Sequence, residues 1–248
     1  MKIAISGKGG CGKSTITVLL SRAFSRMGFK VTVLDADESN IGLVRMLGLE
    51  YIESIAEAYG GRKGLKKVLD EGLEGSLRID IVGASKDNIK VVRIGKIEKG
   101  GEGCACLFGV LAKEVLSSIK CSENEVVLVD MDAGIEHFGR GIDRAVDAIL
   151  FIVDPTFDSI MLAEKASRMA RDLGVTRFMV VLNKVNEETS SIIKDKLSRT
   201  GVRIIGSLRY DPEVMMETLL GLPVIGSTAM NDAIELANTI IKELKGSA

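Results

Sequence analysis

Short runs of consecutive apolar residues alternate along this chain with stretches in which apolar residues recur every three or four positions. Strand-length apolar runs occupy residues 2–6, 30–35, 125–130, 148–154, 177–183 and 202–207. Such runs predict buried strands, whereas the amphipathic stretches between them predict helices. Strands that are apolar on both faces and alternate with helices indicate a parallel sheet covered on both sides. We therefore expect an α/β fold with a doubly wound, mostly parallel sheet flanked by helices on both faces.

Helical spacing is clearest in three segments, residues 13–27, 107–119 and 231–244. In the last of them the apolar residues form one stripe, made of Ile234, Ala237, Ile240, Ile241 and Leu244. A stripe of this kind is typical of a helix that packs on a sheet. A helix for a membrane surface would carry more basic residues on its polar face.

The region between the second strand and the third is harder to interpret. Residues 38–75 are charged and irregular, with a helical piece at 40–48. Residues 77–83 and 91–97 predict two further strands around a turn rich in Gly and Lys.

Composition narrows the possible classes of protein. The chain has 248 residues, of which 46% are hydrophobic and 27% charged, and its net charge is −1. This length suits a single α/β domain spanning residues 1–248. The net charge gives no general support to nucleic-acid binding, and no apolar run reaches the roughly 18 residues of a membrane helix. The chain starts with a strand and not with a signal-peptide pattern, so we expect a cytoplasmic protein.

A glycine-rich motif follows the first predicted strand. Residues 7–14, GKGGCGKS, fit the pattern G-x-x-x-x-G-K-[ST] and lie between a strand and a helix, which is the context of a phosphate-binding loop. Glycines let the backbone curl with its N–H groups pointing at phosphate oxygens, and the helix N-terminus adds partial positive charge. Lys13 is expected to reach the β- and γ-phosphates, and the Ser14 hydroxyl to bind Mg²⁺.

Acidic residues end two of the predicted strands. Asp130 follows a buried run, at the position where a Walker B carboxylate holds Mg²⁺. Asp35 and Asp37 end the second strand, where a carboxylate could orient the attacking water; of these we assign Asp37 to catalysis. A helix-capping role for either residue is the structural alternative.

A second lysine, Lys8, stands directly after the first glycine of the loop. With it, KGGCGKS resembles the deviant Walker A motif of the Mrp/MinD family of P-loop ATPases, which includes MinD, ParA, arsenite ATPases and nitrogenase iron protein. The resemblance implies a Mg²⁺-dependent ATPase that dimerises when nucleotide is bound, with Lys8 contacting phosphates of the partner subunit. Lys8, Lys13, Asp37 and Asp130 would then be the catalytic residues.

The similarity to this family continues along nearly the whole chain. DADES at 35–39 resembles its switch I, and DMDAGIE at 130–136 its switch II. VVLNKV resembles the strand whose Asn reads adenine, and LRYDPEV the loop that closes over the base. The resemblance thus implies nucleotide contacts from Gly9, Gly10, Cys11, Gly12, Lys13, Ser14, Thr15, Asn183, Lys184, Arg209 and Asp211. The Asp that guanine-binding proteins of the wider class place two residues after the Lys is replaced by Asn186, so ATP is expected over GTP.

Within this family, one branch is most similar. Residues 93–109, RIGKIEKGGEGCACLFG, and the switch II string AGIEH resemble CooC-type ATPases, which assist nickel insertion into carbon monoxide dehydrogenase. The resemblance implies a metallochaperone with that enzyme as its client. The chain departs from its relatives at Cys11, where Val or Ile is common. We interpret Cys11 as a small apolar substitute, with redox-sensitive nucleotide binding as the alternative.

Cys104 and Cys106 form a Cys-x-Cys pair flanked by glycines. A closed zinc site needs four ligands, and the chain has one histidine, so one subunit supplies too few. Two thiols from each subunit of a two-fold dimer would make a four-sulfur site for Zn²⁺ or Ni²⁺ at the interface. The alternative is that these cysteines are merely buried or idle. We interpret Cys121 as structural and His137 as a tuner of switch II more than as a ligand.

Two other functions compete with the metallochaperone. An electron-transfer ATPase with an axial iron–sulfur cluster would place a further cysteine near switch II, and residues 131–141 contain none. A positioning or partition ATPase would need a basic DNA-binding face or a membrane-binding tail, and neither is evident in the sequence.

Overall fold

Parallel strands form the centre of the molecule, as the apolar runs predict. The computed structural model describes residues 1–37, 40, 42–61, 64, 83–95, 106–135 and 145–246. One eight-stranded sheet has the order β3-β4-β2-β5-β1-β6-β7-β8. Its strands are β1 (Lys2–Gly7), β2 (Lys30–Asp35), β3 (Ala84–Lys86), β4 (Ile89–Arg93), β5 (Glu125–Asp130), β6 (Ala148–Val153), β7 (Phe178–Val185) and β8 (Arg203–Arg209).

Every neighbouring pair of strands is parallel except the pair at one edge, where β3 runs antiparallel to β4. Asp87 and Asn88 join these two strands, and both have positive φ, at 51° and 60°. A two-residue hairpin turn requires that conformation, and Asp and Asn tolerate it better than most residues. The sequence pattern did not predict β3, and it placed β4 slightly too late. The strand predicted at 77–83 falls almost entirely outside the described residues.

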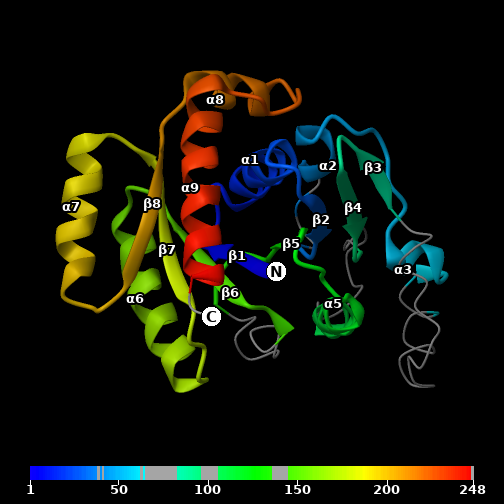
Figure 1. Ribbon diagram of the computed structural model, residues 1–248, viewed down its shortest axis with the longest axis horizontal. Helices are drawn as coiled ribbons and strands as arrows, with labels where there is room; N and C mark the ends of the chain where they lie inside the picture. The colour runs from blue at the N-terminus through cyan, green and yellow to red at the C-terminus, as the bar shows by residue number, and fades with distance from the viewer. Residues whose placement is uncertain are drawn as a thin grey trace.

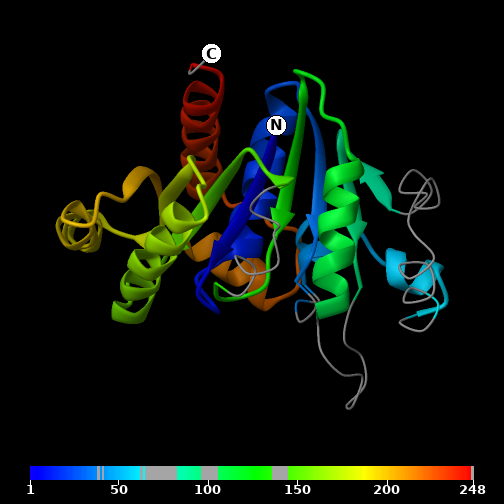
Figure 2. The same cartoon turned by 90° about the horizontal axis from the view of Figure 1, so that it is seen from below.

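Helices cover both faces of this sheet (Figures 1 and 2). Their bounds are α1 (Lys13–Arg26), α2 (Leu43–Met46), α3 (Ile55–Ala58), α5 (Cys106–Ser118), α6 (Phe157–Asp172), α7 (Glu187–Ser198), α8 (Pro212–Leu219) and α9 (Ser227–Lys245). On one face α1, α2 and α9 bury apolar residues against the sheet, and on the other α3, α5, α6 and α7 do so. The expected doubly wound α/β architecture is therefore confirmed.

Helix α9 buries the stripe that the sequence predicts. Ala237 and Ile240 are almost fully buried on this face of the sheet, and Ile234, Ile241 and Leu244 are partly buried beside them. Leu236, which the predicted stripe leaves out, is buried as well. In Figure 1 this helix lies next to α1, which begins at the glycine-rich loop. The last helix of the chain therefore supports the helix that carries the predicted phosphate site.

Phe24 on α1 offers a test of this packing. Its side chain is fully buried, and its ring meets Phe29 edge to face with the centroids 5.7 Å apart. Replacing Phe24 by Ala should lower the free energy of unfolding in urea by about 3–5 kcal/mol, because a large cavity would remain between α1 and the sheet. Phe157→Ala is the matched control. Its ring is 66% exposed, so a change within about 0.5 kcal/mol is expected. Equal losses in the two variants would contradict this account of the core.

Candidate functional site

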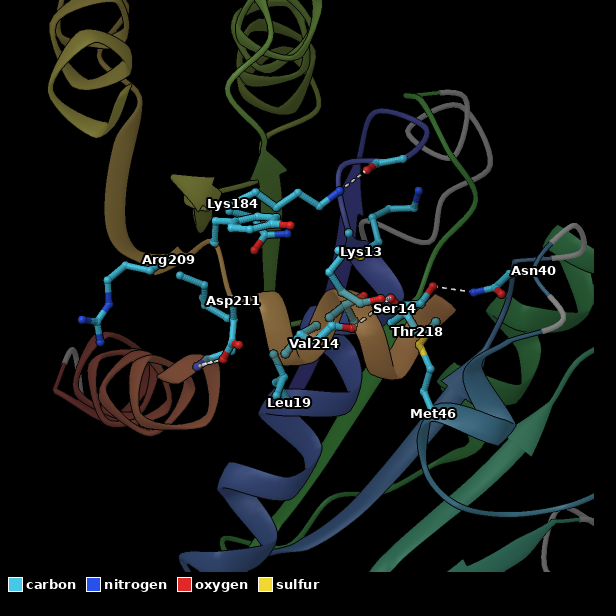
Figure 3. A pocket seen from close by; sticks show the side chains of 18 of the residues that line it. Lys13, Ser14, Leu19, Asn40, Met46, Lys184, Arg209, Asp211, Val214 and Thr218 are labelled. Atoms are coloured by element: carbon cyan, nitrogen blue, oxygen red, sulfur yellow. Dashed lines mark hydrogen bonds between the residues drawn. The ribbon is translucent and has the colours of Figure 1, made fainter. Parts of the chain in front are cut away.

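A cavity of about 450 Å³ opens at the carboxyl ends of the parallel strands. Loops that follow β1, β2, β7 and β8 converge there, which is the edge of an α/β sheet where ligands bind. Ten of the residues predicted from sequence line this cavity together: Gly10, Gly12, Lys13, Ser14, Thr15, Asp37, Asn183, Lys184, Arg209 and Asp211. Figure 3 shows Arg209 and Asp211 on one side of it and Asn40 and Met46 on the other. Segments far apart in sequence thus form one site.

The glycine-rich loop has a conformation that side chains would disrupt. Gly7 has φ 152°, and a Cβ there would stand 2.6 Å from the carbonyl oxygen of Ile152. Gly12 has φ 97°, and a Cβ there would collide with the side-chain amide of Asn183. The Gly134 N–H donates to the Gly7 carbonyl at 3.0 Å, which joins the segment after β5 to the start of the loop. These contacts explain why glycine is needed at both positions.

A hydrogen bond joins the loop to the end of β5. The Ser14 hydroxyl donates to Oδ2 of Asp130 at 2.6 Å, and the Thr17 hydroxyl lies 3.4 Å from Oδ1 of the same carboxylate. Strands β1 and β5 are neighbours, so the register of the sheet sets this contact. The pair presents closely spaced oxygen atoms, the ligand type that Mg²⁺ prefers.

The Asp130 carboxyl is fully buried, and this changes its acidity. Burial raises its pKa from 3.8 to about 7, and the nearby negative charges of Asp35 and Asp37 act in the same direction. The hydrogen bond from Ser14 and the positive charge of Lys13 oppose the shift. A positive ion beside the carboxylate would relieve this cost of burying negative charge.

Asp35 and Asp37 lie at the end of β2 but have different surroundings. Asp35 is 1% exposed and lies 3.9 Å from the guanidinium of Arg93 on β4. Asp37 lines the cavity, and one of its carboxylate oxygens accepts the backbone N–H of Asn40 at 3.1 Å. The geometry favours Asp37 over Asp35 as the carboxylate that faces a ligand.

Cys11 lies beneath the loop and does not line the cavity. Its side chain is fully buried among apolar residues, and burial raises the pKa of the thiol to about 11. A thiol in that environment is neutral at physiological pH and reacts slowly with oxidants. This supports the interpretation of Cys11 as a small apolar residue.

Residues predicted to surround the base already have partners within the chain. The Asn183 amide donates to the carbonyl of Cys11 at 2.8 Å. The Lys184 ammonium donates to the carbonyl of Gly10 at 2.8 Å (Figure 3). Asp211 accepts N–H groups from Glu213 and Ala229, both at 2.9 Å, and so caps α8 and the first turn of α9.

Arg209 lines the cavity, but its guanidinium is paired with Asp232 of α9 at 2.7 Å. Sequence reasoning missed Asp232, because no local pattern marks a buried Asp inside a helix as a partner of a distant Arg. It also missed Asn40, which follows the switch-like string DADES directly and could have been suspected from that position.

The apolar walls of the cavity were not predicted either. They come from five separate elements, and their residues are Leu19, Met46, Leu208, Val214, Met215 and Ala229. Each belongs to an amphipathic or apolar run, so the sequence alone does not distinguish a cavity-wall residue from a core residue. Their common location becomes evident only from the fold.

Several predicted residues lie elsewhere. Lys8 is half-buried and Gly9 is exposed, and neither lines the cavity. Cys104 and His137 lie outside the described residues. Helix α5 begins at Cys106, but the structure does not describe the side chain of this residue. Within the described part of the chain, no group of three His, Cys, Asp or Glu side chains could hold a metal ion. The shared cysteine site therefore stays a prediction.

A family model described as the CobQ/CobB/MinD/ParA nucleotide binding domain matches residues 2–224 of the chain. The chain belongs to this family. It is an ATP-binding ATPase of the MinD/ParA type, as its loop motif predicts.

Two curated relatives of this ATPase align along most of its length. An uncharacterized ATP-binding protein of Methanocaldococcus jannaschii is 42% identical over 89% of this chain and 92% of its own. The carbon monoxide dehydrogenase accessory protein CooC of Rhodospirillum rubrum is 32% identical over 90% of this chain and 88% of its own.

A solved structure agrees with the fold. The septum site-determining protein MinD of Pyrococcus horikoshii, complexed with Mg-ADP, superposes with a TM-score of 0.73 over 100% of this chain and 98% of its own, at 21% identity. At that identity the likeness establishes the fold alone. Among the described residues of this ATPase, no helix is long and apolar enough to span a membrane.

Asp130→Asn should make the ligand-free protein more stable at pH 8 while changing it little near pH 4. With a pKa of about 7, the folded chain keeps a proton that the unfolded chain loses near pH 4. Wild-type stability therefore falls as pH rises between these values, by about 4 kcal/mol at most from this group. The neutral amide of the Asn variant does not titrate, so it removes this pH dependence of stability. Urea unfolding at pH 4 and pH 8 measures the free energy of unfolding of both proteins.

Asp172→Asn serves as the control for this prediction, because Asp172 is exposed on α6 and its substitution removes no buried charge. Its substitution should change stability by no more than about 0.5 kcal/mol at either pH. An Asp130→Asn variant that loses stability equally at both pH values would contradict the account of a costly buried charge.

Proposed function

We propose that this protein is a dimerising, ATP-driven metallochaperone that assists nickel insertion into a carbon monoxide dehydrogenase-like enzyme. The observation that carries the ATP-dependent part is the hydrogen bond between Ser14, which lines the phosphate-loop cavity, and the buried Asp130. The metal-handling part rests on the Cys-x-Cys pair and on the 32% identity to an accessory protein of carbon monoxide dehydrogenase. We infer that residues 1–248 act as a single ATPase domain, since α9 packs beside α1.

The residues of the cavity fit Mg-ATP. Gly12 has no room for a side chain, Lys13 is buried at the loop, and the backbone N–H groups of a helix N-terminus favour phosphate. Ser14 and Asp130 would hold Mg²⁺, with Ser14 as a direct ligand. The ion would neutralise charge on the β- and γ-phosphates.

In this proposal Lys13 binds the phosphates of its own subunit, and Asp37 orients the attacking water. Asp37 suits that role because it follows β2 directly and its carboxylate lines the cavity. Thr15, Asn183, Lys184, Arg209 and Asp211 surround the nucleotide. Asn183 and Lys184 also hold the loop through the carbonyls of Cys11 and Gly10.

Lys8 is proposed to act across a two-fold dimer. It belongs to the loop but does not line the cavity of its own subunit, which supports a contact with the partner's phosphates. A dimer formed in this way would bring together Cys104 and Cys106 of both chains. These thiols would bind one Ni²⁺ or Zn²⁺ ion, the cargo, and ATP hydrolysis would reset the assembly.

Lys13→Ala and Lys8→Ala should impair different steps, ATP binding in the first variant and dimerisation with hydrolysis in the second. Losing Lys13 removes a charged contact within one subunit and should weaken ATP binding by at least about tenfold. Losing Lys8 should leave binding to the monomer within about twofold but abolish ATP-driven dimerisation and hydrolysis. Calorimetry and sedimentation velocity, with ATP and Mg²⁺, measure the two effects. If Lys8→Ala dimerises with ATP as wild type does, Lys8 does not act in trans.

Metal should bind at one ion per dimer, with an affinity that falls as pH is lowered, since thiolates must lose their protons to bind. Binding to the dimer alone means that metal raises the dimer fraction and that ATP alters metal affinity. Cys104→Ala and Cys106→Ala should each remove this coupling and spare nucleotide binding. Cys121→Ala, which is half-buried after α5, is the matched control and should change neither.

Metal stoichiometry combined with sedimentation tests this shared site. One ion per monomer, or a double Cys104/Cys106 variant that still dimerises with metal, would rule it out. A brown, iron-containing protein from anaerobic purification would instead favour electron transfer. ATPase activity without any effect of Ni²⁺ or Zn²⁺ would remove the metallochaperone role and leave the ATPase in place.

A further inference from the structure

The Asn40 side chain lines the cavity and contacts both members of the Ser14–Asp130 pair. Its side-chain Nδ2 donates to the Ser14 hydroxyl oxygen at 2.5 Å and lies 3.5 Å from Oδ2 of Asp130. The Ser14 hydroxyl has one hydrogen, which it donates to Asp130. The amide of Asn40 therefore occupies a lone pair of the Ser14 oxygen. Figure 3 shows this contact reaching across from the segment after β2.

The same asparagine holds the start of α2. Its side-chain oxygen accepts the Gly42 N–H at 2.8 Å, directly before that helix, and its backbone N–H donates to Asp37 at 3.1 Å. One side chain thus connects the candidate metal ligands, the candidate catalytic carboxylate and a helix.

The far end of α2 contacts the segment between α8 and α9. The Met46 carbonyl accepts the Val224 N–H at 2.8 Å, and Val224 belongs to the segment between α8 and α9. The Arg22 guanidinium of α1 also donates to the Met46 carbonyl, at 3.3 Å, while the Met46 side chain lines the cavity. A movement of α2 would therefore shift Met46 in the cavity wall and disturb the segment between α8 and α9.

We propose that Asn40 is a positioning residue that competes with the metal ion for the Ser14–Asp130 pair and transmits the occupancy of that pair to α2. This inference rests on the proposed Mg²⁺-nucleotide site. Nδ2 of Asn40 lies within 3.5 Å of both the Ser14 oxygen and Oδ2 of Asp130, on the cavity side of the pair. It therefore fills the position from which a cation would contact these two oxygens, so the two cannot occupy it together. When Ser14 and Asp130 bind a cation, the Asn40 side chain has to move away from them. Its hydrogen bond with the Gly42 N–H transmits this movement to α2.

Mg²⁺ affinity tests the competition directly. Mg²⁺ is titrated by calorimetry into ADP-saturated protein. Asn40→Ala should bind Mg²⁺ about threefold to tenfold more tightly than wild type, because no hydrogen bond has to be broken first. Asn238→Ala is the matched control. Its amide bonds the Ile234 carbonyl on the exposed side of α9, and its Mg²⁺ affinity should equal that of wild type.

A second variant guards against loss of the α2 cap. Asn40→Ser keeps an oxygen that can accept the Gly42 N–H but lacks the amide donor, so it should also bind Mg²⁺ more tightly. Unchanged or weaker Mg²⁺ binding in both variants would overturn the proposal, since weaker binding would make Asn40 an aid to the metal and not its competitor.

The coupling to α2 has its own readout. With ¹³C-labelled methionine methyls, the Met46 signal of the wild-type ADP complex should shift when Mg²⁺ is added, and the shift should be absent in Asn40→Ala. A Met46 shift of equal size in the variant would contradict transmission through Asn40. If wild-type protein binds no ADP even with Mg²⁺, the nucleotide site itself is refuted. If ADP and Mg²⁺ bind equally well to all variants, only the role of Asn40 fails.

Discussion

A carboxylate with no exposure to water, Asp130, is the constraint on which the rest of the site depends. An unpaired negative charge in that position would destabilise the fold by several kcal/mol. Ser14, Thr17 and Lys13 limit this penalty, and all three belong to the first turns of α1. The loop before α1 must therefore end close to β5, which requires the tight backbone that Gly7 and Gly12 permit. The chemistry of one strand end thus fixes the loop, the helix and their glycines.

Sheet order delivers the other groups to the same place. β1 lies between β5 and β6, and β2 lies beside β5, so the loop, Asp37 and Asp130 come from three adjacent strands. On the other side, β7 brings Asn183 and Lys184, two strands away from β1. Parallel strands place all of these residues at their carboxyl ends. An antiparallel sheet of the same segments would send half of them to the opposite edge.

The sequence predicted those parts of the molecule whose signals are local. Apolar runs located β1, β2 and β5 to β8, the stripe on α9 was correct, and the G-x-x-x-x-G-K-S motif identified the phosphate loop. Residues whose roles depend on long-range packing were not predictable in this way. Asp232 is identified as a partner of Arg209 only when α9 lies beside β8. Met46 and Val214 become walls of one cavity only when α2 and α8 approach each other. The short strand β3 carries too few apolar residues to show a pattern.

The contacts divide the site into a base side, formed by the ends of β7 and β8, and a switch side, formed by the segment after β2 and by α2. Asn183 and Lys184 bond the loop carbonyls from β7, and Asp211 and Asp232 join the end of β8 to α9, so four side chains fix the base side before any ligand arrives. On the switch side, the side chain of Asn40 bridges the Ser14–Asp130 pair and the start of α2. Preorganised groups bind a ligand without first being ordered, whereas the hydrogen bonds of the Asn40 side chain can be exchanged for contacts with a ligand at little free-energy cost. A nucleotide would therefore bind to a base side that is already ordered. The conformational change that accompanies binding of its metal ion and phosphates would occur on the switch side.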